Sequence, residues 1–273
     1  MRITNRPALA AAGTIAMTLA AAVAAPSDPP PAGDAATPPA ATPVAIPAQV
    51  DLRETLKSMG LPPREQGARG TCSIFTTCAS IEFALAKYRG KAERLSPEYL
   101  NWAASQALGR PSDGNFFHNA LAGFETHGIC SDAAMPYQPT YDASRVPSSA
   151  AAAEAARVKK EAASALQVHW IIPWKPDRFG VGNAEFDAIK SVLARGYPVA
   201  AGAGHSRLLV GYRDDASKPG GGVFLTLDSG LGRFDEVTYE FVRKEVADVF
   251  WIEAVTPSPA AAPSRETTTR DAK

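Results

Sequence analysis

The sequence predicts an α+β protein in which a helical first half is followed by an antiparallel β half. Helical periodicity dominates up to about residue 195, and short apolar runs separated by turn residues dominate after it. Low-complexity segments flank both parts, so we expect the folded region to span residues 46–255. A helical half packed against a β half leaves a cleft between the two.

The composition is that of an ordinary soluble protein and identifies no ligand. Of the 273 residues, 45% are hydrophobic, and 28 Lys and Arg balance 28 Asp and Glu. A chain without net charge has no basic field that would hold nucleic acid, so nucleic acid is not expected as a partner. Nothing in the composition indicates an oligomeric state.

The N-terminus has the pattern of a signal peptide, residues 1–25. Arg2 and Arg6 precede an apolar run that ends in the small residues AVA at 22–24. The alternative, an uncleaved anchor, needs about 20 strongly apolar residues, whereas this run is mostly alanine. No cysteine follows the run to accept a lipid, so we expect a periplasmic or secreted product with no membrane contact after cleavage.

Two segments lack the apolar residues that ordering would require. Residues 26–45 are almost entirely Pro, Ala, Asp, Ser and Thr and predict a flexible linker, and residues 256–273 predict a disordered tail.

The first half contains helix signals at several places. Residues 72–88 carry an apolar stripe at i, i+4, i+7 and i+11, with Thr71 as the expected N-cap. Ser96, followed by Pro and Glu, starts a second helix, and residues 116–128 outline a third. An Ala-, Glu- and Lys-rich helix over 143–166 is expected on the surface between the halves.

The second half begins with a helix that stops at Gly196 and continues as strands. The strands are expected at 199–203, 207–213, 223–228 and 249–255, separated by turn residues such as KPGG at 218–221.

Cys72 is the residue with the clearest chemical context. It follows a glycine-bearing loop, QGARGT at 66–71, and stands in the first turn of a helix, where the helix dipole favours a thiolate over a thiol. His205 lies in another glycine-flanked bend, and Asp228 ends the next strand. Because a hairpin brings neighbouring strand ends together, Asp228 is placed to orient the His205 ring.

The order of these motifs resembles that of the papain family of cysteine peptidases, over most of residues 46–255. The resemblance rests on IPAQVDLR at 46–53, QG at 66–67, LSPE at 95–98, DG at 113–114, GI at 128–129 with PY at 136–137, and His205 leading into VGY at 210–212. It implies a papain-like two-subdomain fold, with Cys72 on the central helix of the left half and His205 with Asp228 on a barrel-like right half.

The resemblance also implies roles for individual residues. Cys72 would be the nucleophile, His205 its proton partner and Asp228 the residue that orients it, while Gln66 would donate a side-chain N–H to the oxyanion. The substrate-binding residues would be Gly114, Asn115 and Gly204. The substrate would be a peptide or unfolded protein, and the reaction needs neither metal nor cofactor.

The sequence departs from the family pattern at several positions. Departures near the expected site are Ser73 for an aromatic, Asp228 for Asn, Gly230 for a shielding Trp, Arg69 and Ser112 for half-cystines, and Asn115 for Gly. Without the Trp, the His205–Asp228 hydrogen bond is expected to be more accessible to water and weaker. Asn115 is expected to narrow the backbone edge along which an extended substrate would bind. No prosegment is recognised between the signal and residue 46.

The remaining cysteines and histidines are expected to be structural. A disulfide between Cys78 and Cys130 stays open, and the spacing of His118, His127 and His169 is not that of zinc ligands. Glu82 is expected to be a buried, paired acid.

Two alternatives to a peptidase remain from the sequence. One is a catalytically degenerate papain-like fold that binds peptides, and the other is a thiol acyltransferase or amidase that uses the same residues on other acyl groups.

Overall fold

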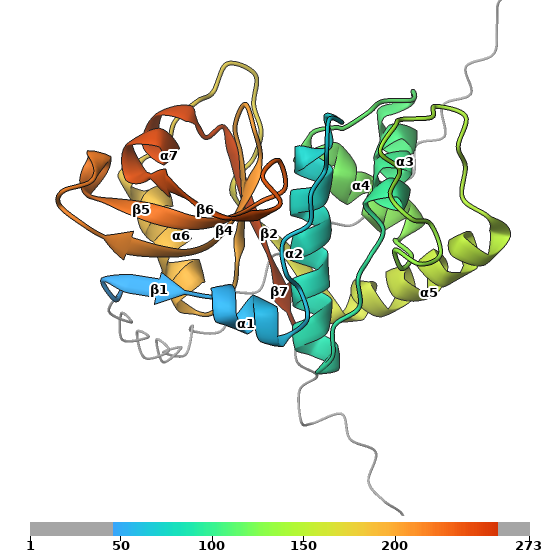
Figure 1. Ribbon diagram of the computed structural model, residues 1–273, viewed down its shortest axis with the longest axis horizontal. Helices are drawn as coiled ribbons and strands as arrows, with labels where there is room; N and C mark the ends of the chain where they lie inside the picture. Colours follow the sequence, from blue (N-terminus) through green and yellow to red (C-terminus); the bar gives the residue numbers. More distant parts are fainter. Residues whose placement is uncertain (1–45, 256–273) are drawn as a thin grey trace, which may run out of the picture. The chain divides into compact units, whose positions relative to one another are not determined.

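The computed structural model describes residues 46–255, so the expected signal peptide (1–25), linker (26–45) and tail (256–273) lie outside the described residues. Most of the helices lie in the first part of this range and most of the strands in the second (Figure 1), which confirms the predicted α+β class. The helices are α1 (Arg53–Ser58), α2 (Cys72–Arg89), α3 (Pro97–Leu108), α4 (Phe117–His127), α5 (Ser149–Ala165), α6 (Asn183–Ala194) and α7 (Tyr239–Glu245). The strands are β1 (Gln49–Asp51), β2 (Leu166–Ile172), β3 (Val199–Gly202), β4 (Arg207–Asp214), β5 (Gly222–Asp228), β6 (Arg233–Thr238) and β7 (Asp248–Ala254).

Helix α2 is the central element. Its predicted apolar stripe is buried, with Ile74, Cys78 and Ile81 without exposed surface, and its other faces are buried as well. A helix covered on all sides belongs to the core rather than the surface. Figure 1 shows why, because α2 stands between the sheet on one side and helices α3, α4 and α5 on the other.

The helix starts are partly as predicted. Ser96 caps α3, since its Oγ accepts a hydrogen bond from the Tyr99 backbone N–H at 2.9 Å and Pro97 is the first helical residue. Thr71 stands at the N-cap position of α2, but its hydroxyl makes no capping bond. Instead it lies 2.7 Å from the hydroxyl of Tyr137. Thr71 therefore occupies the predicted N-cap position but does not cap the helix through its side chain.

Helix α5 is shorter than predicted and packs closely. It spans Ser149–Ala165, capped by Ser148, and buries one face of small residues. The buried residues are Ala151, Ala155, Val158, Ala162 and Ala165. The chain passes directly from this helix into β2, whose first residue had been assigned to the helix.

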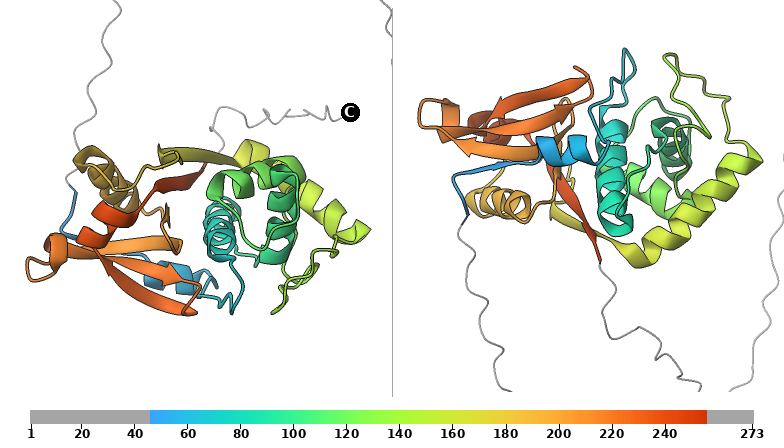
Figure 2. Two further views of the ribbon diagram at one scale, coloured as in Figure 1. Left: turned by 90° about the horizontal axis from the view of Figure 1, so that it is seen from above. Right: turned by 60° about the horizontal axis from the view of Figure 1, so that its bottom comes forward.

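The strands form one antiparallel sheet in the order β2-β7-β3-β4-β5-β6, with β1 paired to β4. The four predicted strands are β3, β4, β5 and β7. Strands β1, β2 and β6 were not predicted. Strand β1 has only three residues, and the residues of β2 and β6 are mostly exposed or only partly buried and lack a clear alternation. Figure 2 shows the sheet and its covering helices α6 and α7 beside the α2–α5 half.

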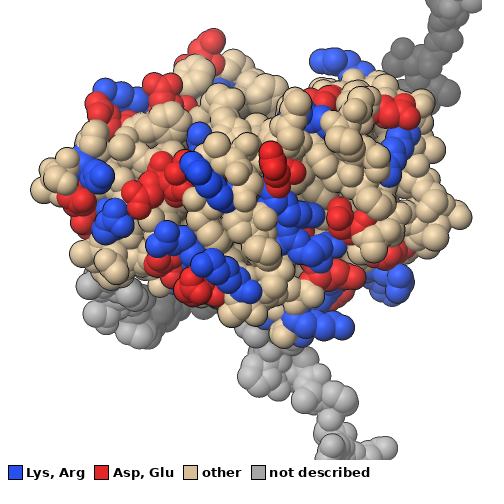
Figure 3. Space-filling model, in the orientation of Figure 1, with Lys and Arg blue, Asp and Glu red and all other residues tan. Residues whose placement is uncertain are grey.

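The two halves share one core. Apolar residues of α2 join those of β3, β4 and β7 in a continuous cluster, and the rings of Phe117 and Phe250 meet at 5.0 Å across the junction. Figure 3 shows acidic and basic side chains interspersed on one face. Among the helices of residues 46–255, none is both long and apolar enough to cross a membrane.

Candidate active site

Cys72 is the first residue of α2, as predicted. The first turn of a helix has backbone N–H groups without intrahelical acceptors, and it is the positive end of the dipole. No acidic side chain stands in this turn to oppose an anion. The thiol is partly exposed, so the position combines access with a field that favours the thiolate.

His205 follows β3 in the bend that leads into β4, and its ring lies close enough to the Cys72 thiol for each group to shift the pKa of the other. The interaction with Cys72 is the main reason why the pKa of His205 is raised, and Asp228 adds to the rise while burial opposes it. For Cys72, burial works to raise the pKa, but hydrogen bonds from His205 and from Ser206 outweigh it and lower the pKa. Both directions favour a thiolate beside an imidazolium.

Asp228 ends β5 and holds the other side of the ring. The His205 Nε2 and the Asp228 Oδ1 lie 2.8 Å apart, which leaves Nδ1 as the nitrogen that faces Cys72. Burial works to raise the pKa of Asp228, yet the hydrogen bond from His205 and the charges of His205 and Arg207 hold it below its usual range. The three side chains that were predicted from the sequence to act together, those of Cys72, His205 and Asp228, therefore lie next to one another in the fold.

Gln66 lies beside this group but uses much of its amide locally. Its Nε2 donates to the Arg69 carbonyl at 2.8 Å, and its Oε1 accepts from the Ser229 hydroxyl at 2.7 Å. One amide proton is therefore committed to the loop that precedes Cys72, and the second is left for another acceptor. These bonds tie that loop to the turn after Asp228.

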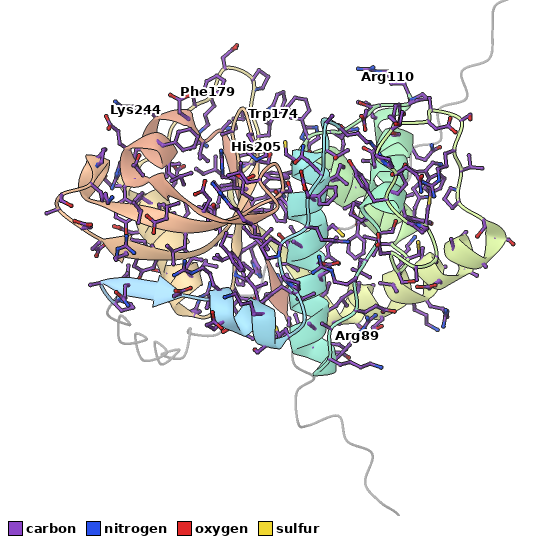
Figure 4. All side chains as sticks on the ribbon, in the orientation of Figure 1. Arg89, Arg110, Trp174, Phe179, His205 and Lys244 are labelled. Atoms are coloured by element: carbon purple, nitrogen blue, oxygen red, sulfur yellow. The ribbon has the colours of Figure 1, made fainter. Side chains whose placement is uncertain are left out.

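A cavity of about 540 Å³ opens next to Cys72, with walls from both halves. Figure 4 shows His205, Trp174 and Phe179 near one another at the end of the sheet half that faces the start of α2. Of the three residues that the resemblance suggests for substrate binding, Asn115 and Gly204 line this cavity, whereas Gly114 does not. The predicted cleft between the halves is therefore present.

The same cavity carries an unusual carboxyl and an aromatic rim. Asp248 is 5% exposed and has no ion pair or side-chain hydrogen bond with residues 46–255, and burial raises its pKa to about 6. Phe116 and Phe179 are 54% and 71% exposed and stand with Trp174 at the rim. The wall thus offers apolar contact together with a carboxyl that changes charge in mildly acidic solution.

Other histidines and cavities are separate from this chemistry. A larger groove of about 750 Å³ between α4, α5 and β2 contains neither Cys72 nor His205. His169 pairs with Glu253 at 2.9 Å, His127 contacts Trp102, and His118 stacks on Phe116. Within residues 46–255, no three His, Cys, Asp or Glu side chains form a group that would hold a metal ion.

Comparison with solved structures identifies the architecture. The chain aligns with xylellain, a cysteine protease from Xylella fastidiosa, with a TM-score of 0.60 and 18% identity, covering 77% of this chain and 87% of that one. It also aligns with digestive procathepsin L 3 of Tenebrio molitor, with a TM-score of 0.59 and 18% identity over 80% and 73% of the two chains. The chain has the papain-like fold.

The chain is also similar to a third solved structure and, over part of its length, to one protein in sequence. The ragweed allergen Amb a 11, a cysteine protease in its proform, matches with a TM-score of 0.57 and 19% identity over 78% of this chain and 68% of that one. In sequence, a cathepsin L-like proteinase of Phaedon cochleariae is 33% identical over 98 residues, which is 36% of this chain and 30% of that protein's length. No family model matches the chain.

The papain-like fold closes around Asp228 without the expected Trp. The Asp228 side chain is 1% exposed and that of His205 29%, so the bond is shielded on the carboxylate side, while the ring side keeps some contact with water. Gly230 takes the space, since a Cβ there would lie 3.0 Å from the His205 Cε1, and its N–H donates to Asp228 Oδ1 at 2.8 Å. A backbone segment thus shields the carboxylate in place of an indole.

Two departures on the helical side of this papain-like cleft, Ser73 and Asn115, lie next to Gly114, which matches the family pattern. The Ser73 hydroxyl donates to the Asn115 carbonyl. The Asn115 side chain bonds with Asn119, the Phe116 N–H and the Ala104 carbonyl, so its polar atoms serve the helices behind the cleft. Gly114 has φ +87°, and a Cβ there would lie 1.9 Å from the Gly70 carbonyl oxygen. Its role in the structure is this close approach to the loop before Cys72.

Arg69 holds the same loop from the position where relatives have a half-cystine. Its guanidinium is buried, pairs with Glu98 at 2.6 Å and Asp113 at 2.9 Å, and donates to the Gln138 carbonyl at 2.8 Å. All three cysteines are free, so the disulfide between Cys78 and Cys130 that the sequence left undecided is absent. Glu82 is buried and paired with Arg64 at 2.8 Å, as expected. Ion pairs therefore fasten this region.

Replacing Arg69 with methionine is expected to destabilise the protein by about 3 kcal/mol. Removing the cation leaves the buried Glu98 carboxylate with only Arg145, at 3.7 Å, and the Gln138 backbone N–H, at 3.2 Å, and a buried charge that loses its main partner costs far more than the pair itself contributes. Denaturant unfolding measures the change. Arg53→Met is the matched control, because its pair with Asp51 is exposed and contributes under about 1 kcal/mol. Equal losses in the two variants would contradict a fastening role for Arg69.

Proposed function

We propose that this chain is a cysteine peptidase that hydrolyses peptide bonds through an acyl-enzyme intermediate. The observation that carries the proposal is the placement of Cys72, at the start of α2, beside His205, whose ring is bonded at 2.8 Å to the buried Asp228 carboxylate. A nucleophile, a base and an orienting group in hydrogen-bond reach of one another are the requirement for nucleophilic catalysis. The papain-like fold supports the same conclusion.

The chemistry proceeds in two halves. The Cys72 thiolate attacks the carbonyl carbon of a peptide bond, and the His205 imidazolium gives its Nδ1 proton to the departing amine as the C–N bond breaks. This leaves a thioester on Cys72. Water, deprotonated by the now neutral His205, attacks the thioester, and the acid product leaves as Cys72 returns to the thiolate.

The oxyanion formed in each half needs hydrogen-bond donors. The backbone N–H of Cys72, at the helix start, is one, and the uncommitted amide proton of Gln66 is the second. The bonds of Gln66 to Arg69 and Ser229 hold its amide in one orientation, which is what an oxyanion donor requires.

The cleft supports a peptide or unfolded protein as substrate. Its walls come from both halves, and exposed aromatic side chains at its rim provide apolar contact for a chain lying across it. We also propose that the protein acts outside the cytoplasm, on the basis of the N-terminal signal pattern.

The test is the alkylation rate of Cys72 as a function of pH, measured with limiting iodoacetamide and intact-mass readout. Because the pKa of Cys72 is lowered and that of His205 raised, reactivity is expected to persist well below pH 8.5, about where an ordinary thiol ionises. His205→Ala removes the imidazolium, so reactivity in that variant should shift up toward the pH range of an ordinary thiol.

Cys78 and Cys130 provide internal controls, because both are buried and burial raises their pKa values to about 12. A Cys72 that reacts no faster than these two in acid would overturn the proposal and favour a peptide-binding role. A reactive Cys72 that transfers acyl groups to added amines without cleaving any peptide pool would favour an acyltransferase or amidase instead.

A further inference from the structure

One side chain outside the predicted group makes direct contact with it. Arg207, the first residue of β4, donates from Nε to Asp228 Oδ2 at 2.8 Å and from Nη1 to the His205 carbonyl at 3.0 Å. We propose that Arg207 and Asp228 act as one positioning unit that sets both the orientation and the proton affinity of His205. This inference rests on the proposed thiolate–imidazolium chemistry.

The sheet register explains why the two residues meet. Leu208 of β4 pairs with Leu227 of β5 in antiparallel register, so the preceding and following positions, Arg207 and Asp228, lie opposite each other. Opposite residues on neighbouring strands point to the same face. The contact is therefore built into the sheet rather than made by mobile surface chains.

The hydrogen bonds of the carboxylate are divided between its two oxygens. Oδ1 accepts from the His205 ring at 2.8 Å and from the backbone N–H groups of Gly230 at 2.8 Å and Leu231 at 3.2 Å. Oδ2 accepts from Arg207. Rotation of the carboxylate would break bonds on both sides, so Arg207 keeps Oδ1 directed at His205.

This arrangement requires a carboxylate rather than an amide. In Asp228→Asn, an asparagine whose oxygen faces His205, Gly230 and Leu231 would turn its NH₂ toward the Arg207 Nε–H, donor against donor. The reverse orientation would face NH₂ to the backbone donors. An asparagine at 228 is therefore compatible with the site only when residue 207 is no longer a donor.

The charge of Arg207 also acts on His205, through the Asp228 carboxylate. The Asp228 side chain is 1% exposed, and an unshared carboxylate next to the ring would hold the His205 proton tightly. Arg207 balances that charge. Two other charged groups lie near the pair. The Cys72 thiolate is on the opposite side of the His205 ring. Arg233 is opposite Asp228 in the β5–β6 register, but it is exposed and forms none of the ion pairs found within residues 46–255.

The experiment compares wild type, Arg207→Met, Asp228→Asn and the double variant. The first readout is the pKa of His205 from its ring NMR signal in a Cys72→Ala background, assigned among the four histidines with His205→Ala. We expect the pKa to rise in Arg207→Met, by about one unit, and to fall most in Asp228→Asn. The double variant should fall between Asp228→Asn and wild type.

The second readout is the Cys72 alkylation rate at mildly acidic pH, with Cys72 present. Asp228→Asn alone is expected to lower the rate by about a hundredfold, and adding Arg207→Met should restore about tenfold, because the second change removes the donor conflict. A residue that only stabilised the fold would not rescue a second substitution in this way.

Controls keep the outcomes distinct. Arg213→Met removes an arginine from the same strand, where its pair with Glu236 is exposed, and should leave both readouts unchanged. Arg207→Lys retains the charge and provides a milder variant if Arg207→Met unfolds. The inference is overturned if neither Arg207 substitution moves the His205 pKa, or if Asp228→Asn performs as well as the double variant. If the pKa order holds while Cys72 stays unreactive, the peptidase proposal fails and the positioning unit stands.

Discussion

Replacing Cys72 with alanine is expected to lower peptide hydrolysis by about a thousandfold or more, to background. The thiolate forms the covalent bond of the intermediate, and no other side chain among residues 46–255 occupies the start of α2 beside His205. Cleavage of a fluorescently labelled, unfolded protein measures the loss. The melting temperature should change little, because the thiol is partly exposed and leaves little space behind.

Cys130→Ala is the matched control for this loss. Cys130 is buried in a smaller apolar cluster with Tyr99 and Ala155, away from His205, so its removal should cost some stability and leave the rate per folded molecule intact. Full activity in Cys72→Ala, or equal losses in both variants, would show that Cys72 is not the nucleophile.

Gly114→Ala is expected to destabilise the protein by more than about 3 kcal/mol. The residue has φ +87°, and the new Cβ would lie 1.9 Å from the Gly70 carbonyl oxygen, which belongs to backbone and not to a side chain that can turn away. Relief requires the loop before Cys72 to move. Denaturant unfolding should show the loss, and alkylation of Cys72 should slow as its loop shifts.

Gly67→Ala separates the cost of the backbone conformation from the cost of the steric clash. Gly67 also has positive φ, at +65°, but nothing lies within 4 Å of its missing Cβ. That variant should lose only the cost of the backbone conformation, about 1 kcal/mol. A Gly114→Ala protein as stable as Gly67→Ala would mean that the two loops are not in firm contact.

The parts of the fold that could be predicted are those with strong local signals. The helix from Cys72 follows from its apolar period, and the helix after Ser96 from the cap and the first-turn proline. Strands β3, β4, β5 and β7 are short apolar runs between turn residues. Strand β2 was missed because it follows the helix without a turn residue between them and its residues lack a clear alternation, so only pairing with β7 identifies it as a strand.

The site was predicted less completely, for a geometric reason. Cys72, His205 and Asp228 each stand at an element end that sequence can locate. The contact of Arg207 with Asp228 depends on the β4–β5 register, which slips by one residue between Leu209 and Gly211. Counting back from the connecting turn without this bulge would place Arg207 opposite Ser229 and on the wrong face. Irregular register of this kind comes from tertiary packing.

The ion pairs around Arg69 have a practical consequence for the chemistry of Cys72. A reactive thiolate is prone to oxidation to sulfenic acid or a mixed disulfide, and reductants reverse both. In a scaffold fastened by cystines, the reductant that restores the nucleophile also attacks the framework. Here all three cysteines are free, and Glu98 and Asp113 hold the loop through Arg69. Strong reducing agents should therefore regenerate Cys72 without loosening the structure that surrounds it.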